Sequence, residues 1–242
     1  MLGCRRLVED KTDYRPLLTE RINLMVERMK KSPVLSAESY PNECWTFCNT
    51  VALAAMRVAD YLDGTDHSEF LRNWVTIAKA KLTDPKSGLL ISTYTVAGRP
   101  IYGPEGSTIW MAAHCLQVVD EDFAADQYAR AKRELGREFL GFGDAWEWPA
   151  SWTGSPDVDS GPVVPILGIS AGASGLAFLG ASSFKDDAYL SSLLASIEFA
   201  GFPANENGRL KYCASNQVGD AVLLYAAVQG PVWDRVRPRT RQ

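Results

Sequence analysis

Reactive side chains are concentrated in one ten-residue stretch, residues 40–49, which reads Tyr-Pro-Asn-Glu-Cys-Trp-Thr-Phe-Cys-Asn. Its chemically useful members are two thiols, a carboxyl and an amide: Cys44, Cys48, Glu43 and Asn49. Asn42 is a favourable N-cap residue, and apolar residues at helical spacing follow from Thr46 to Leu62. The pattern therefore predicts that these groups gather at the start of a helix.

The two cysteines have three interpretations. Their spacing of four residues places them on one face of a helix, with Cys44 in the first turn, where free N–H groups favour a thiolate. A thiol in that position can transfer protons or act as a nucleophile. Cys48 is equally well explained as a small apolar filler. A disulfide along one helical face is geometrically poor, and a zinc site would need two more ligands, so we expect no metal here.

A second cluster lies in the loop from residue 141 to residue 161. It combines aromatic and carboxyl groups: Trp146, Glu147, Trp148, Trp152, Asp157 and Asp159. One aspartate is expected to cap the helix that follows, since carboxylates are favoured at helix starts. The other aspartate, or Glu147 between its two tryptophans, is a candidate general acid if burial raises its pKa.

Two further polar side chains are candidates for a pocket wall. His114 lies beside Cys115 in an apolar helical segment, where a lone histidine is more often hydrogen-bonded and structural than catalytic. Tyr102 lies beside a turn-rich segment and could donate a hydrogen bond to a ligand.

Helical periodicity dominates the elements that must position these groups. A β-prone run between turn-forming residues predicts one short hairpin near residues 89–102. The expected helices are Tyr14–Lys30, Thr46–Leu62, Ser68–Lys81, Ser107–Val119, Glu121–Glu138, Pro162–Leu179, Asp186–Phe199 and Asn216–Gln229.

Composition narrows the class of protein. The 242 residues are 46% hydrophobic and 22% charged, which is typical of one globular domain, with residues 1–12 and 231–242 as peripheral tails. A net charge of −4 argues against a nucleic-acid partner. The uncharged run 161–184 is too rich in glycine, serine and proline for a membrane span. Five scattered cysteines and no signal-peptide core predict a cytoplasmic location.

The order of the helices suggests how they are layered. Apolar helices alternate with amphipathic, charged ones, as expected for a ring of helical hairpins with buried inner and half-solvated outer helices. The loops rich in aromatic and acidic residues would then meet at one end of the ring. A plain helical bundle is the competing architecture.

Three segments resemble the linalool dehydratase-isomerase-like family of (α/α)6 barrel proteins. They are residues 45–50 (Trp-Thr-Phe-Cys-Asn-Thr), residues 107–111 with 119–124, and residues 147–149 with 157–162. The resemblance implies an all-α toroid and a cofactor-independent lyase or isomerase. Such an enzyme adds water to, or removes it from, a small apolar, terpenoid-like alcohol. The chain is short for twelve helices, so the toroid would lack one or two hairpins, or a partner subunit in a homo-oligomer would complete it.

The resemblance also matches residues one by one. Cys48 corresponds to one cysteine of the family's active-site pair, whereas this chain has residues 38–40 where the second cysteine is expected, so Cys44 is a candidate substitute. The expected catalytic groups are therefore Cys48, Cys44, Glu43, Asp157 and Asp159. The substrate would be surrounded by Trp45, Phe47, Asn49, Tyr102, Trp110, His114, Trp146, Glu147 and Trp148.

Two other classes of function remain open at this point. A glycosidase or sugar lyase would pair Glu147 with Asp157 or Asp159 and stack sugars on the tryptophans, but would leave the cysteines without a role. A non-catalytic helical scaffold would leave all three carboxyls exposed or capping helices.

Overall fold

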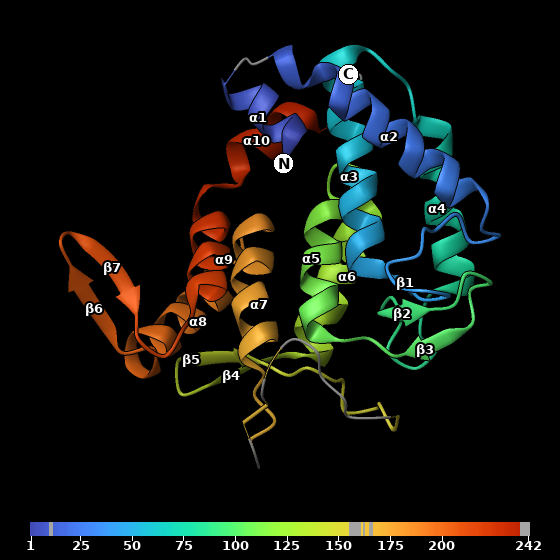
Figure 1. Ribbon diagram of the computed structural model, residues 1–242. Helices are drawn as coiled ribbons and strands as arrows, with labels where there is room; N and C mark the ends of the chain where they lie inside the picture. Colours follow the sequence, from blue (N-terminus) through green and yellow to red (C-terminus); the bar gives the residue numbers. More distant parts are fainter. Residues whose placement is uncertain (10–11, 155–160, 162, 165–166, 238–242) are drawn as a thin grey trace.

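The computed structural model describes residues 1–9, 12–154, 161, 163–164 and 167–237 and is mostly helical (Figure 1). The helices are α1 (Leu2–Glu9), α2 (Arg15–Lys30), α3 (Thr46–Asp63), α4 (Ser68–Lys81), α5 (Gly106–Leu116), α6 (Glu121–Glu134), α7 (Ala171–Ser183), α8 (Asp187–Ala200), α9 (Gln217–Val228) and α10 (Gly230–Val236), with a 3-10 turn at Thr12–Tyr14.

Four of these helices form a row in which α3 packs on α5, α5 on α7, and α7 on α9 (Figure 1). Their partners α6 and α8 pack on α5 and α7. The main core lies between these layers and contains fully buried large side chains such as Leu53, Met56, Ile109 and Trp110. Within the described residues, α3 and α9 are the first and last helices of the row and do not pack extensively on one another. Below, the two ends of the row are the side where α3, α5 and α7 begin and the side where they end.

Side-chain caps explain where several helices begin. Asp120 accepts a hydrogen bond from the Phe123 amide at the start of α6, and Ser170 and Asp186 do the same for α7 and α8. Asn216 caps α9 through two amides. The predicted helix Ser68–Lys81 is confirmed with both bounds, and most other predicted helices differ by only a few residues.

Three predicted boundaries are wrong. Asn42 does not cap α3; it has a φ of +55° in the turn from Tyr40 to Glu43, and Trp45 is the N-cap. The helix predicted to reach Glu138 ends at Glu134, because the chain turns into strand β4 at Gly136, where a Cβ would lie 2.7 Å from the Lys132 carbonyl. The helix predicted to begin at Pro162 begins at Ala171.

Both predicted tails contain packed helices instead. The Arg6 side chain of α1 forms two hydrogen bonds of 2.7 and 2.8 Å to Asp63, at the end of α3. Trp233 of α10 is buried, and its indole donates to the His114 carbonyl of α5 at 2.9 Å. The Arg6 and Asp63 side chains and the Trp233 indole are buried by contacts between residues far apart in the sequence. The polar composition of the two terminal segments therefore does not predict these contacts.

Three small antiparallel sheets complete the fold. The predicted hairpin is present as β2 (Thr93–Tyr94) and β3 (Pro100–Tyr102), and β1 (Cys44–Trp45) joins its other edge. Two further hairpins pair β4 (Gly136–Phe139) with β5 (Phe142–Ala145), and β6 (Pro203–Glu206) with β7 (Arg209–Tyr212). No helix in the described residues is both long and apolar enough to cross a membrane.

Candidate functional site at the start of the helix row

The N-terminal ends of α3, α5 and α7 are linked by a buried chain of polar contacts. The Thr46 amide, at the start of α3, donates to the Ser92 carbonyl at 2.8 Å. The Ser92 hydroxyl in turn accepts from the Glu105 amide, just before α5, at 2.8 Å. The Gly106 amide then donates to the Glu147 carbonyl at 2.7 Å. These bonds hold the loops and the helix starts together at one end of the row.

Glu147 is the centre of this arrangement and is only 1% exposed. One carboxylate oxygen accepts from both the amide and the hydroxyl of Ser107, at 3.0 and 2.5 Å. The other oxygen accepts from the Ser170 hydroxyl at 2.5 Å. A carboxylate is favoured here because it faces the first turns of two helices, where amides are unpaired and the macrodipole is positive. The arrangement anchors the loop to the starts of α5 and α7.

The two cysteines of the reactive stretch lie in different environments. Cys44 is fully buried in β1, opposite Tyr94, and burial raises the pKa of its thiol to about 11, with the Glu38 charge as a second cause. The expectation that Cys44 lies in the first helical turn and favours a thiolate is therefore wrong. Cys48 is the third residue of α3 and is exposed. Of the pair, Cys48 is the thiol that a ligand can reach.

The neighbours of Cys48 are held by specific contacts. The half-buried Glu43 carboxylate accepts a hydrogen bond of 2.5 Å from the Trp45 indole. Asn49 is buried, and its amide bonds to both the N–H and the carbonyl of Ala37 and to the Trp45 carbonyl. Asn49 thus holds the segment around Ala37 against the start of α3. Phe47 is half-buried beside Cys48.

Aromatic residues of the later loops lie at the same end of the row. Tyr102 ends β3 and pairs with Thr93. The Trp146 indole donates to the Leu167 carbonyl at 3.1 Å, and Trp148 stacks on Trp152 with ring centroids 5.4 Å apart. The predicted acids Asp157 and Asp159 lie outside the described residues, so their distance from Cys48 stays untested.

Two other expected ligand contacts lie in the packed interior. Trp110 is fully buried and packs against Tyr128 of α6 and Tyr189 of α8, with ring centroids 5.8 and 6.1 Å apart. His114 is fully buried at the other end of α5, bonded to the Ser183 and Tyr225 hydroxyls at 2.7 and 2.9 Å. Burial lowers the pKa of His114 to about 3, and the Arg237 charge adds to this effect. Both side chains are thus packed in the interior, and their contact with a substrate stays a prediction.

Sequence reasoning missed the small polar residues that build the site: Ser92, Glu105, Ser107 and Ser170. For Ser170 a signal was present, because serine is a favoured N-cap residue and Ser170 caps α7. What the sequence does not show is that the starts of α5 and α7 share one buried carboxylate. Within the described residues, no group of three His, Cys, Asp or Glu side chains is arranged to hold a metal ion.

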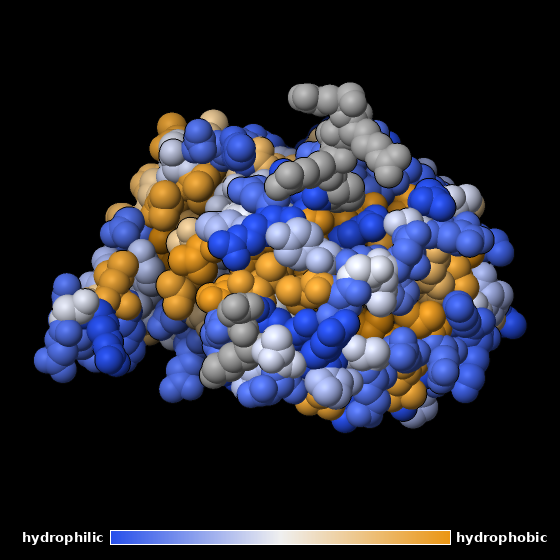
Figure 2. All heavy atoms as spheres, turned by 90° about the horizontal axis from the view of Figure 1, so that it is seen from above, coloured by the Kyte–Doolittle hydropathy of each residue, from blue (hydrophilic) through white to orange (hydrophobic). Residues whose placement is uncertain are grey.

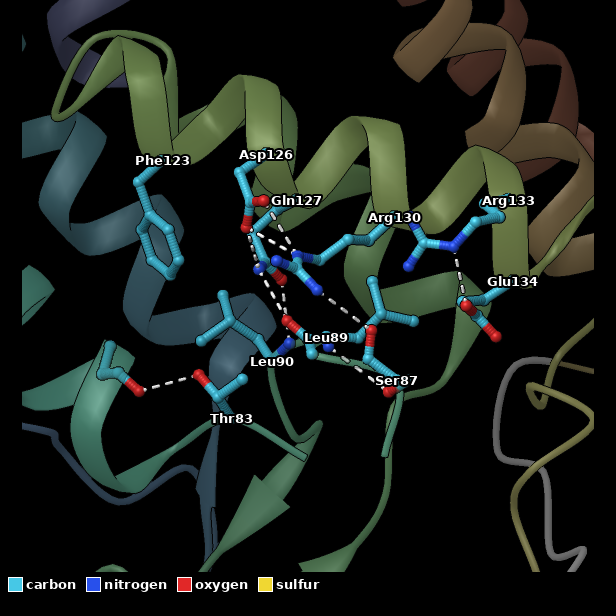
Figure 3. A network of polar contacts seen from close by, with 12 residues as sticks. Thr83, Ser87, Leu89, Leu90, Phe123, Asp126, Gln127, Arg130, Arg133 and Glu134 are labelled. Atoms are coloured by element: carbon cyan, nitrogen blue, oxygen red, sulfur yellow. Dashed lines mark hydrogen bonds and ion pairs between the residues drawn. The ribbon is translucent and has the colours of Figure 1, made fainter. Parts of the chain in front are cut away.

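A cavity of about 310 Å³ lies between α4, α6 and residues 83–90. Figure 3 shows Gln127 and Arg130 of its lining bonded to backbone atoms of residues 87–90. The Gln127 side chain accepts from the Leu90 amide at 2.8 Å and donates to the Gly88 carbonyl at 3.0 Å, and Arg130 pairs with Asp126 at 2.8 Å. These contacts fasten the loop to α6, and none of the expected site residues lines the cavity.

Comparison with known proteins agrees with the resemblance seen in the sequence. The family model described as linalool dehydratase/isomerase matches residues 12–218, which include α2 to α8, the exposed Cys48 and the Glu147 anchor. No curated protein matches the chain. Because the matched region spans well over half of the 242 residues, the chain belongs to the linalool dehydratase/isomerase family.

Proposed function

We propose that this protein is a cofactor-independent dehydratase or isomerase of a small apolar, terpenoid-like alcohol. The observation that carries the proposal is an exposed thiol, Cys48, in the first turn of α3 of a chain that belongs to the linalool dehydratase/isomerase family. The helix row is then part of an (α/α)6 toroid, and the reaction takes place at the end where the inner helices begin.

The proposed reaction needs one group that gives a proton and one that accepts a proton. Protonation of the substrate hydroxyl allows water to leave with the C–O bonding electrons, which leaves an allylic cation. Removal of a proton from a carbon next to the cation gives a diene, whereas return of water to the far end of the allyl system gives the isomeric alcohol. Nearby aromatic rings stabilise the cation through their electron-rich faces.

We assign the proton transfers to Cys48 and a carboxyl group. Glu43 is the described candidate, since its carboxylate is half-buried on the segment leading into α3 and is oriented by Trp45. Asp157 and Asp159 stay in the proposal as the alternative acids. We leave Cys44 out because its thiol is fully buried and its pKa is raised to about 11. Trp45 and Phe47 are the rings proposed to face the cation.

The sugar-processing alternative is not favoured by the site. It requires Glu147 to reach a substrate in an open groove. Both oxygens of this carboxylate instead accept hydrogen bonds from Ser107 and Ser170, and the residue is 1% exposed.

Turnover of linalool by the purified protein tests the proposal. Gas chromatography should detect the triene formed by loss of water or the primary alcohol formed by isomerisation. Cys48→Ala should lower kcat/KM by about a hundredfold or more, since a proton-transfer group typically contributes that much. The matched control is Cys213→Ala, which removes another exposed thiol. A Cys48→Ala enzyme with normal activity and a normal melting temperature would exclude the thiol from the mechanism.

A further inference from the structure

An apolar groove of about 260 Å³ lies between α1, α2 and α3, near the upper end of the molecule in Figure 1. Its lining includes Leu18, Ile22 and Met25 from α2, and Ala52 and Ala55 from α3. Figure 2, which looks onto this end of the molecule, shows hydrophobic surface exposed between hydrophilic residues. The volume lies between that of an engineered cavity that holds benzene, about 150 Å³, and that of drug-sized pockets, about 300 Å³ or more.

The walls of the groove are held in place by close contacts. A Cβ added to Gly3 would lie 2.6 Å from a Val58 methyl group, so the glycine allows α1 to approach α3 closely. The Arg6–Asp63 pair fastens α1 to the end of α3, with both side chains 7% exposed, and Arg15 contacts the same carboxylate at 3.0 Å. The groove is therefore a formed feature and not a gap between loose helices.

The groove continues the face of α3 on which Cys48 lies. Ala52 and Ala55 follow Cys48 by four and seven residues, which places all three on one stripe of the helix. At a rise of 1.5 Å per residue, Ala52 is about 6 Å and Ala55 about 10 Å from Cys48 along the axis. Alanine at these two positions leaves space that a larger side chain would fill.

The chemistry of the lining favours an uncharged hydrocarbon chain. Apart from the thiol of Cys4 and the Arg21 side chain, the lining is apolar. The Arg21 side chain is 61% exposed, as expected for a side chain that packs its methylene groups on the rim and keeps its charge in water. Each methylene group that a ligand buries here strengthens its binding about fourfold.

We propose that this groove binds the hydrocarbon chain of the alcohol, with the hydroxyl end toward Cys48 and the far end toward Cys4. The inference rests on the proposed function and adds to it a rule for chain length. An alkenol of about ten carbons reaches from Cys48 into the groove, whereas a five-carbon alkenol occupies only the end near Cys48.

Filling the groove tests this rule. Ala55→Leu, with Ala52→Leu as a second variant, should raise KM for linalool about tenfold or more and leave KM for a five-carbon tertiary alkenol, and kcat for both, close to wild type. Ala200→Leu is the matched control, because Ala200 is exposed on α8. Equal effects on both substrates, or none on either at unchanged melting temperature, would overturn the chain-length rule.

Thiol labelling tests whether linalool occupies the groove, independently of turnover. The intact protein is alkylated with maleimide in the presence and absence of linalool. The labelling rates of Cys4 and of the exposed Cys213 are then measured by mass spectrometry of the digested protein. We expect linalool to slow labelling of Cys4 several-fold and to leave Cys213 unchanged. Protection without turnover would support the groove and contradict the proposed reaction, whereas turnover with an unprotected Cys4 would contradict the groove alone.

Discussion

Neighbouring helices are joined by a buried acidic residue at one end of the row and by a buried basic residue at the other. At the N-terminal ends of α5 and α7, the buried Glu147 carboxylate joins the helices through Ser107 and Ser170. At the C-terminal ends of α5, α7 and α9, the buried His114 joins them through Ser183 and Tyr225. Each end thus has one titratable residue bridging hydroxyl groups of neighbouring helices.

At the C-terminal end, burial decides the protonation state of the titratable residue. A carboxylate near helix starts is favoured by the macrodipole, and a protonated histidine near helix ends would be favoured for the same reason. His114 is nevertheless held neutral, because burial lowers its pKa to about 3. Burial is the main cause of this lowered pKa, and the Arg237 charge is the second cause. The chemistry proposed here is located at the N-terminal end, where Cys48 is exposed beside the anchored loops.

The largest expected effect is at the C-terminal end. Trp233 stacks on His114 at 4.6 Å between ring centroids and donates to its carbonyl, so Trp233→Ala should lower the free energy of unfolding by about 4 kcal/mol. Chemical denaturation measures this change. Phe199→Ala, at an aromatic residue that is 76% exposed, should change it by less than about 0.5 kcal/mol. Similar values for the two variants would show that α10 does not secure this end.

A smaller loss is expected at the N-terminal end. Glu147→Gln keeps the shape of the side chain but replaces three charge-assisted hydrogen bonds with weaker ones, so the free energy of unfolding should fall by about 2 kcal/mol. The control is Glu138→Gln, since Glu138 accepts from Ser192 at the surface and should matter little. An unchanged denaturation midpoint for Glu147→Gln would argue that the carboxylate charge does not hold the helix starts.

The smallest effect is the pH dependence of the His114 bridge. The unfolded histidine has a pKa of about 6.5, whereas the folded one has a pKa of about 3. Below pH 6.5 the unfolded state therefore binds a proton that the folded state does not, and stability falls as the pH drops toward 3. At pH 5.5 the loss should be about 1.4 kcal/mol. Denaturation of wild type and His114→Gln across this range measures the difference, and parallel profiles would contradict the assignment.

The helical segments follow largely from the sequence. Apolar spacing of 3.6 residues is a local signal, so it placed α4, α8 and α9 within a few residues. The turn formers around residues 84–102 likewise predicted the hairpin. The family resemblance is carried by short segments and was confirmed by the match over residues 12–218.

Only the tertiary structure decided which of these residues can meet a ligand. Cys44 and Cys48 look equivalent as a spaced pair, yet strand β1 buries the first while α3 exposes the second, because backbone pairing with Tyr94 overrides the helical pattern. Glu147 resembles a loop acid, but two distant serines enclose its carboxylate. Such outcomes depend on contacts between residues tens of positions apart. Local periodicity carries no information about those contacts, whereas it does determine where helices begin and end.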